Sequence, residues 1–175
     1  MSDEPGHIAR PDHPAESDGA RGDEPARMAQ NVRELRCSVE DLFRVLADGW
    51  LYPAWVVGAS RIREVDADWP RAGSRLHHSV GVWPVLIDDT TVMTEWVPGV
   101  RMRARARGWP IGEAVVVIEA QPRSEDRCVV RIFEEAAIGP ARLIPKFLRV
   151  LMLNLRNRET LRRLAYLAEG GARSA

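Results

Sequence analysis

The feature that most constrains this chain is its longest helical pattern, Pro140 to Ala168, whose first half is too apolar to remain in water. At about 100° per residue, one side of the predicted helix carries Phe147, Leu151, Asn154, Arg158, Leu161 and Ala165, and the other carries Lys146, Arg149, Arg156 and Arg163. A helix with such a side packs against another apolar layer, and the only candidate is the strand-rich chain that precedes it.

Two polar residues, Asn154 and Arg158, interrupt the apolar side of this helix about one turn apart. In one interpretation, Arg158 extends to solvent at the edge of the sheet and Asn154 bonds a backbone group. In the other, both face a partly hydrated cavity, where Glu134 or Glu135 of the last strand pairs with Arg158. The choice decides whether the space beneath the helix contains a polar anchor.

Residues 60–136 contain strand-like segments that are separated by turn residues at short intervals. The segments are 60–66, 73–82, 86–97, 100–107, 112–121 and 127–136, and a weaker strand is predicted at 28–37. Connections this short favour antiparallel pairing. Met102, Ala104 and Ala106 alternate with arginines, which predicts one apolar and one solvent-facing side. The small alanines leave room beneath the helix.

Two short helices are predicted between the first strand and the second. Ser38-Val39-Glu40-Asp41 is close to a capping box and begins the first of them. Trp50, Tyr52 and Trp55 follow in the second, which ends near Gly58. These rings either close the open end of a curved sheet or line a ligand cavity, and the two roles are compatible.

The chain of 175 residues has no formal net charge and is long enough for one domain with a real core. Residues 1–26 contain four prolines and no aromatic residue, so we predict a disordered tail there. Residues 27–170 are expected to form the single domain, and residues 171–175 a disordered end.

Several classes of function lack support in the sequence. There is no secretory signal and no apolar run long enough to span a bilayer, so we expect a cytoplasmic protein with reduced, buried cysteines and no integral membrane association. Motifs for nucleotide binding, for a serine nucleophile and for zinc are missing, and we expect no cofactor and no metal. The basic residues near the C-terminus are not interleaved with aromatic residues, so no nucleic-acid partner is expected.

The order of these predicted elements is the helix-grip plan. The stretch Ala47–Gly58, followed by Ser60-Arg61-Ile62, resembles the SRPBCC (START-like, Bet v 1-like) superfamily, and residues 76–84 and 107–110 resemble its bacterial polyketide cyclase/dehydrase-like branch. The resemblance covers about residues 30–168. It implies an α+β fold in which a curved antiparallel sheet of about seven strands wraps around a long C-terminal helix, with two short helices between strands 1 and 2.

The resemblance also implies a deep cavity between sheet and helix, and pockets of this kind measure about 300–1,000 Å³. We expect it to bind a small hydrophobic molecule such as a lipid, polyketide or isoprenoid, in a monomer or a dimer. The predicted lining is Trp50, Tyr52, Trp55, His78, Trp96, Phe133, Leu151, Asn154 and Arg158.

Two alternatives to a binding protein remain open at this point. One is a polyketide cyclase or aromatase that folds its substrate by shape, with acid–base help from His78, Glu134 or Arg158. No residue matches an aromatase active site, so none is transferred from that family. The other alternative is an interaction module whose cavity is filled and vestigial.

Overall fold

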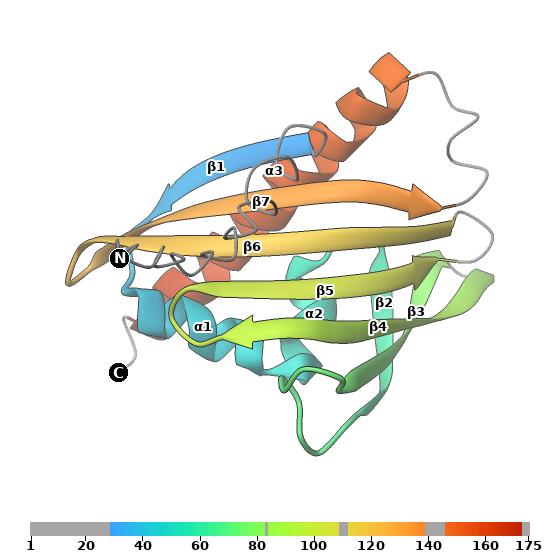
Figure 1. Ribbon diagram of the computed structural model, residues 1–175, viewed down its shortest axis with the longest axis horizontal. Helices are drawn as coiled ribbons and strands as arrows, with labels where there is room; N and C mark the ends of the chain where they lie inside the picture. The colour runs from blue at the N-terminus through green and yellow to red at the C-terminus, as the bar shows by residue number, and fades with distance from the viewer. Residues whose placement is uncertain (1–28, 83, 109–111, 139–145, 173–175) are drawn as a thin grey trace, which may run out of the picture.

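The computed structural model describes residues 29–82, 84–108, 112–138 and 146–172. Seven antiparallel strands form one sheet in the order β1-β7-β6-β5-β4-β3-β2. The strands are β1 (Ala29–Leu35), β2 (Ala59–Val65), β3 (Arg75–Val82), β4 (Val85–Val97), β5 (Arg101–Gly108), β6 (Gly112–Ser124) and β7 (Arg127–Ile138). Figure 1 shows them as one curved layer with the helices behind it.

The helices are α1 (Val39–Ala47), the short 3₁₀ helix η2 (Gly49–Leu51), α2 (Tyr52–Trp55) and α3 (Lys146–Ala172). The long helix α3 packs against α1, α2, β1 and β7. The predicted α+β helix-grip fold is therefore confirmed. The tail predicted at 1–26 and most of the end predicted at 171–175 lie outside the described residues, as do residues 140–145, where the predicted helix began.

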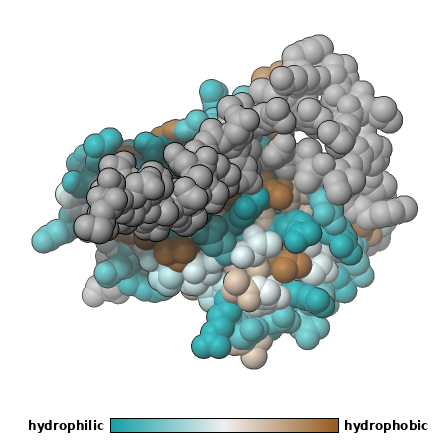
Figure 2. Space-filling view, viewed as in Figure 1, coloured by the Kyte–Doolittle hydropathy of each residue, from teal (hydrophilic) through white to brown (hydrophobic). Residues whose placement is uncertain are grey.

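The two sides of the sheet differ as the alternation predicted. On β5, Met102 and Ala104 are buried beneath the helices, and Arg105 and Arg107 are exposed on the other side. The described residues on the face shown in Figure 2 are mostly hydrophilic, and the hydrophobic ones form small separate patches. The core consequently lies between the concave side of the sheet and the helices.

The start of α1 also follows from local sequence. Ser38 Oγ accepts a hydrogen bond from the Asp41 backbone N–H at 3.0 Å, and Asp41 Oδ2 accepts one from the Ser38 backbone N–H at 3.2 Å. This reciprocal pair is the predicted capping box, which satisfies two donors that the first turn of a helix otherwise leaves free. It fixes where α1 begins.

The buried side of α3 differs from the predicted one in the first half of the helix. Its fully buried residues are Asn157, Thr160, Leu161, Leu164, Ala165 and Ala168. Extending that side backward places Leu151 roughly 110° from its centre, and Leu151 is 53% exposed. The predicted line is wrong here because it is centred roughly 70° to one side of the buried residues. Its drift of about 20° over seven residues carries its first half further out. In Figure 1 the first turns of α3 extend past the sheet.

Candidate functional site

A small pocket lies between the sheet and the helices α2 and α3. The sheet, the α2 region and α3 all contribute to its lining, which consists of Tyr52, Trp55, Val56, Thr91, Met102, Ala104, Ala106, Val116, Ile132, Glu134, Arg156, Asn157 and Thr160. The free space is about 30 Å³, which holds a water molecule and is far below the roughly 300–1,000 Å³ of ordinary ligand sites. The described residues therefore do not enclose the deep cavity that the resemblance implied, although the pocket occupies its predicted place.

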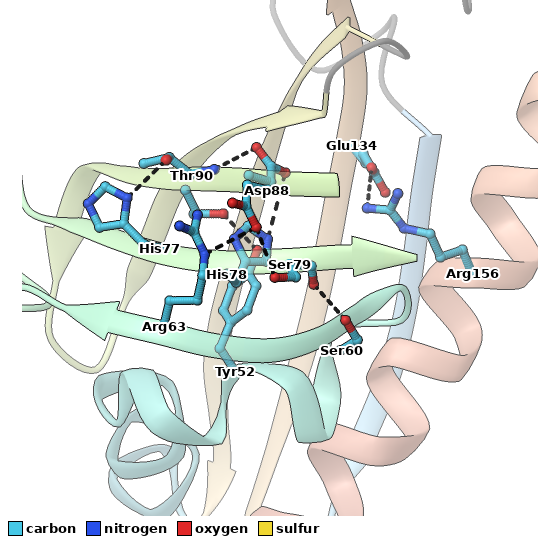
Figure 3. Close-up of polar contacts among 12 residues, drawn as sticks. Tyr52, Ser60, Arg63, His77, His78, Ser79, Asp88, Thr90, Glu134 and Arg156 are labelled. Carbon is cyan, nitrogen blue, oxygen red and sulfur yellow. Dashed lines mark hydrogen bonds and ion pairs between the residues drawn. The ribbon is translucent and has the colours of Figure 1, made fainter. Parts of the chain in front are cut away.

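Glu134 and Arg156 form an ion pair in the wall of this pocket (Figure 3). Glu134 projects from β7 and its side chain is 1% exposed, whereas Arg156 projects from α3 and is 39% exposed. Arg156 Nη2 lies 2.6 Å from Glu134 Oε1. Burial raises the pKa of Glu134, and the charge of Arg156 offsets only part of this rise. Arg156 thus balances a buried carboxylate and lies between it and the solvent.

This pair corrects the predicted partner of Glu134. The sequence suggested Arg158, but Arg158 is exposed and does not line the pocket. Arg156 and Arg158 lie on opposite flanks of the buried side, which passes through Asn157. Glu134 meets the flank of Arg156, and Arg158 lies with Leu151 on the other, exposed flank. The side chain of Glu135, the other predicted partner, lies outside the described residues.

Three polar side chains of the pocket wall retain atoms without a hydrogen-bond partner in the described part of the chain. They are Trp55 with its Nε1, Asn157 with its Nδ2 and Glu134 with its Oε2, while Glu134 Oε1 has the ion pair with Arg156. Asn157 lies near enough to Glu134 to help lower the pKa of that carboxyl, but its Nδ2 does not reach hydrogen-bond geometry. Buried polar atoms are normally paired, so a cluster of unpaired ones marks a site where water or a ligand belongs.

His78 lies behind the pocket wall. Its ring meets the Tyr52 ring edge-on, with centroids 5.1 Å apart, and Tyr52 Oη and Thr91 Oγ1 share a hydrogen bond of 3.0 Å. Burial raises the pKa of Tyr52 to about 12, so the phenol keeps its proton at neutral pH. His78 Nε2 lies 3.7 Å from Asp89 Oδ2, and both side chains are buried. Figure 3 shows His78 and Tyr52 side by side.

The state of His78 follows from this burial. Burial lowers the pKa of His78 to about 4, so the imidazole is neutral at neutral pH. Burial also raises the pKa of Asp89, which disfavours a charged pair between the two. His78 does not line the pocket. Acid–base help from His78 would therefore have to pass through Tyr52.

Two of the predicted lining residues, Tyr52 and Trp55, line the pocket. Their rings contact each other with centroids 5.2 Å apart. His78 is buried, but it lies behind Tyr52 and does not line the pocket. Trp96 packs on Phe43 of α1, with ring centroids 5.2 Å apart, and belongs to the core rather than to the pocket.

The other predicted lining residues lie away from the pocket. Trp50 is 63% exposed, and Leu151 and Arg158 are exposed on α3. Asn154 is half-buried, and Phe133 is half-buried on β7, where its neighbours on either side are the residues that face inward. The exposure of Trp50 is explained by the short η2 helix, which turns the Trp50 ring outward, whereas the Tyr52 and Trp55 rings turn inward.

Sequence reasoning missed Thr91, Arg156, Asn157 and Thr160 as pocket residues. A signal for the last two was present in the second half of α3. Leucines and alanines recur there at helical spacing through Ala168, and the same spacing carried backward reaches Thr160 and Asn157. Thr91 had no such signal, since its inward position depends on its register with Leu76 of β3.

A second hollow lies along the surface of α3 and is larger, at about 530 Å³. It is lined by Arg33, Ala54, Arg162, Arg163, Ala165, Tyr166, Leu167 and Glu169. Its charged groups are largely engaged, because Glu159 binds both Arg162 and Arg163, and Glu169 accepts a hydrogen bond from the Arg36 backbone. We therefore place the candidate site in the interior pocket.

Two further features of the described residues bear on function. Ranges 29–82, 84–108, 112–138 and 146–172 contain no group of three or more His, Cys, Asp or Glu side chains arranged to hold a metal ion. Among the helices that the structure describes, none combines the length and the hydropathy needed to cross a bilayer.

Comparisons with known proteins give the fold. No protein-family model matches the chain, and no curated protein matches it. Solved structures do match. Protein CV1439 from Chromobacterium violaceum is 21% identical, with a TM-score of 0.61 over 80% of this chain and 96% of that one. A START superfamily protein from Mycobacterium smegmatis is 16% identical, with a TM-score of 0.58 over 84% and 97%.

The di-domain ARO/CYC BexL of the BE-7585A biosynthetic pathway is 14% identical, with a TM-score of 0.64. The match covers 82% of this chain and 46% of BexL, so this chain spans about half of that protein. Likeness at these identities shows a shared fold. The chain thus shares its fold with the START superfamily protein and with part of the di-domain ARO/CYC BexL.

Proposed function

From this START-like fold, we propose that the protein binds a small, largely apolar molecule between its sheet and the helices α2 and α3. A polar group of that molecule would be held beside Glu134 and Asn157. The supporting observation is the pocket wall, in which apolar side chains surround a few buried polar atoms without partners among the described residues. Apolar walls with a small number of convergent polar groups are typical of sites for small molecules.

The ligand needs more room than the 30 Å³ that is free. Movement of Arg156 can provide this room, because its side chain lines the pocket and reaches from the solvent to Glu134. In this proposal the guanidinium swings outward when a ligand enters. Apolar desolvation then favours binding, and the cost of separating Arg156 from Glu134 reduces the affinity.

Replacing Arg156 tests this closing role. We expect Arg156→Ala to bind an apolar probe such as 2-naphthol about tenfold more tightly, a change of about 1.4 kcal/mol, because no ion pair must be broken. Isothermal titration calorimetry measures the affinity. Arg158→Ala is the matched control, since Arg158 is exposed on the same helix and should leave affinity unchanged. Equal affinities for Arg156→Ala and wild type would contradict the closing role.

Filling the pocket tests whether binding occurs there. Ala106 lines the pocket on β5, and the larger side chain of Ala106→Leu should weaken binding at least about tenfold. Ala72→Leu, at an exposed turn position, should bind like wild type. Native mass spectrometry with 2-naphthol, fatty acids, flavonoids and quinones gives the readout. A protein that binds none of these compounds would overturn the proposal and favour an interaction module.

One observation favours a second candidate function, a polyketide cyclase-type enzyme. Glu134 is a buried carboxyl with a raised pKa in the wall of the pocket, which suits a group that exchanges a proton with a bound substrate. This role belongs to Glu134 rather than to His78 or Arg158, which do not line the pocket. Turnover of a polyketide-like substrate by wild type, and its loss in Glu134→Gln, would support this alternative.

A further inference from the structure

The unpaired polar atoms of the pocket point to the chemical class of the ligand, and this inference rests on the proposed binding function. Two of them are donors, Trp55 Nε1 and Asn157 Nδ2, and one is an acceptor, Glu134 Oε2, because Glu134 Oε1 is held by Arg156 at 2.6 Å. All three side chains line one pocket and are at least 97% buried. Their only charged contact in the described chain is the ion pair between Arg156 and Glu134 Oε1.

We infer that the ligand presents a hydroxyl group to this cluster, and so is an alcohol or a phenol with an apolar body. A hydroxyl has one hydrogen to donate and two lone pairs to accept with. Its hydrogen matches the acceptor of Glu134, and its two lone pairs match the donors of Trp55 and Asn157, which line the same pocket. A ketone or an ether only accepts and leaves the carboxylate without a donor, and an ammonium only donates and leaves both N–H groups unpaired.

The size of the pocket and its walls agree with this class. The free space of about 30 Å³ accommodates a group as small as a hydroxyl. Beyond the polar atoms, the walls are apolar and include Met102, Ala104, Val116 and Ile132, which suit the body of the molecule. A water molecule offers the same hydrogen-bonding chemistry, so the test must separate a ligand hydroxyl from a resident water.

The test compares three probes of nearly equal shape: 2-naphthol, 2-methoxynaphthalene and naphthalene. Calorimetry on the whole protein should give at least tenfold tighter binding for 2-naphthol than for the other two. In Asn157→Leu the preference should fall to less than threefold. The readout is the ratio of the affinities for 2-naphthol and naphthalene within each variant, so that a change in the room available to both probes cancels. This variant should fold, because it removes a buried amide group that has an unpaired donor. Asn154→Leu, on the same helix but outside the pocket, should keep the full preference.

Trp55→Phe provides an independent check, since it removes the second donor and keeps an aromatic ring. It should also reduce the preference for 2-naphthol. Equal affinity of wild type for all three probes would overturn the inference and leave the binding function standing, with a resident water on the polar atoms. Retention of the full preference in both Asn157→Leu and Trp55→Phe would overturn it as well. Failure of every probe to bind wild type would overturn the binding function itself.

Discussion

Leu164→Ala is expected to lower the free energy of unfolding by about 2–5 kcal/mol, because it removes a fully buried leucine and leaves a cavity. Leu164 sits on the side of α3 that packs against the rest of the domain, so little can move to fill the space. Leu151→Ala should change stability by less than about 0.5 kcal/mol, because Leu151 is largely exposed. Urea denaturation at neutral pH measures both variants.

The comparison tests which side of α3 faces the sheet. The two substitutions are chemically identical and lie on one helix, so their difference reports burial alone. A large loss of stability in Leu151→Ala, with a small one in Leu164→Ala, would mean that the helix is rotated toward the side first predicted from sequence. That rotation would also remove Asn157 and Arg156 from the pocket.

Stability should also fall steeply with acidification because of His78. The unfolded chain protonates this imidazole near its ordinary pKa of 6.5, while the folded protein holds the pKa at about 4. Between these values the unfolded state binds more protons, so the folded state loses about 3 kcal/mol as the pH falls from 7 to 4. The glutamine side chain does not titrate, so the variant His78→Gln should lack this part of the loss of stability on acidification. Urea denaturation at several pH values measures it.

His77→Gln is the control for this prediction. His77 neighbours His78 on β3 but points to the other side of the sheet, where Nδ1 lies 3.1 Å from Thr90 Oγ1. This variant retains His78 and should show the wild-type loss. Glu134 and Asp89 have raised pKa values and act in the opposite direction, since the folded state takes up their protons first. If the free energy of unfolding changed with pH equally in His78→Gln and in wild type, the result would contradict a buried, neutral His78.

The features that depend on short fixed spacings followed from the sequence. The capping box at Ser38 needed only two residue types three positions apart, and it is present. The inward side of β5 needed only strict alternation, and Met102 and Ala104 are buried as expected. The order of the elements along the chain and the place of α3 came with the helix-grip resemblance, and the structure agrees.

The residues that meet in the pocket did not follow in the same way. Arg156 and Arg158 are two residues apart and so lie about 200° apart around the helix, on opposite flanks of its buried side. The predicted line followed the flank of Arg158 and Leu151, whereas Glu134 meets the flank of Arg156. The rotation of α3 is set by Leu161, Leu164 and Ala168 in its second half, which lies against the rest of the core. The free volume beneath it depends on how thirteen side chains fit together, and no periodicity encodes that fit.

The arrangement of the edge strands has a consequence for how the chain assembles. β1 and β2 are consecutive in sequence but form opposite edges of the sheet, and Leu35 of β1 pairs with Cys128 of β7. During synthesis, β1 must wait for nearly the whole chain to emerge before it finds its neighbour, and α3, which packs on β1, comes later still. Pairing across such a long loop is entropically costly and slow. The hairpins from β2 to β7 should therefore form first, and the closing of β1 and α3 over them should complete folding.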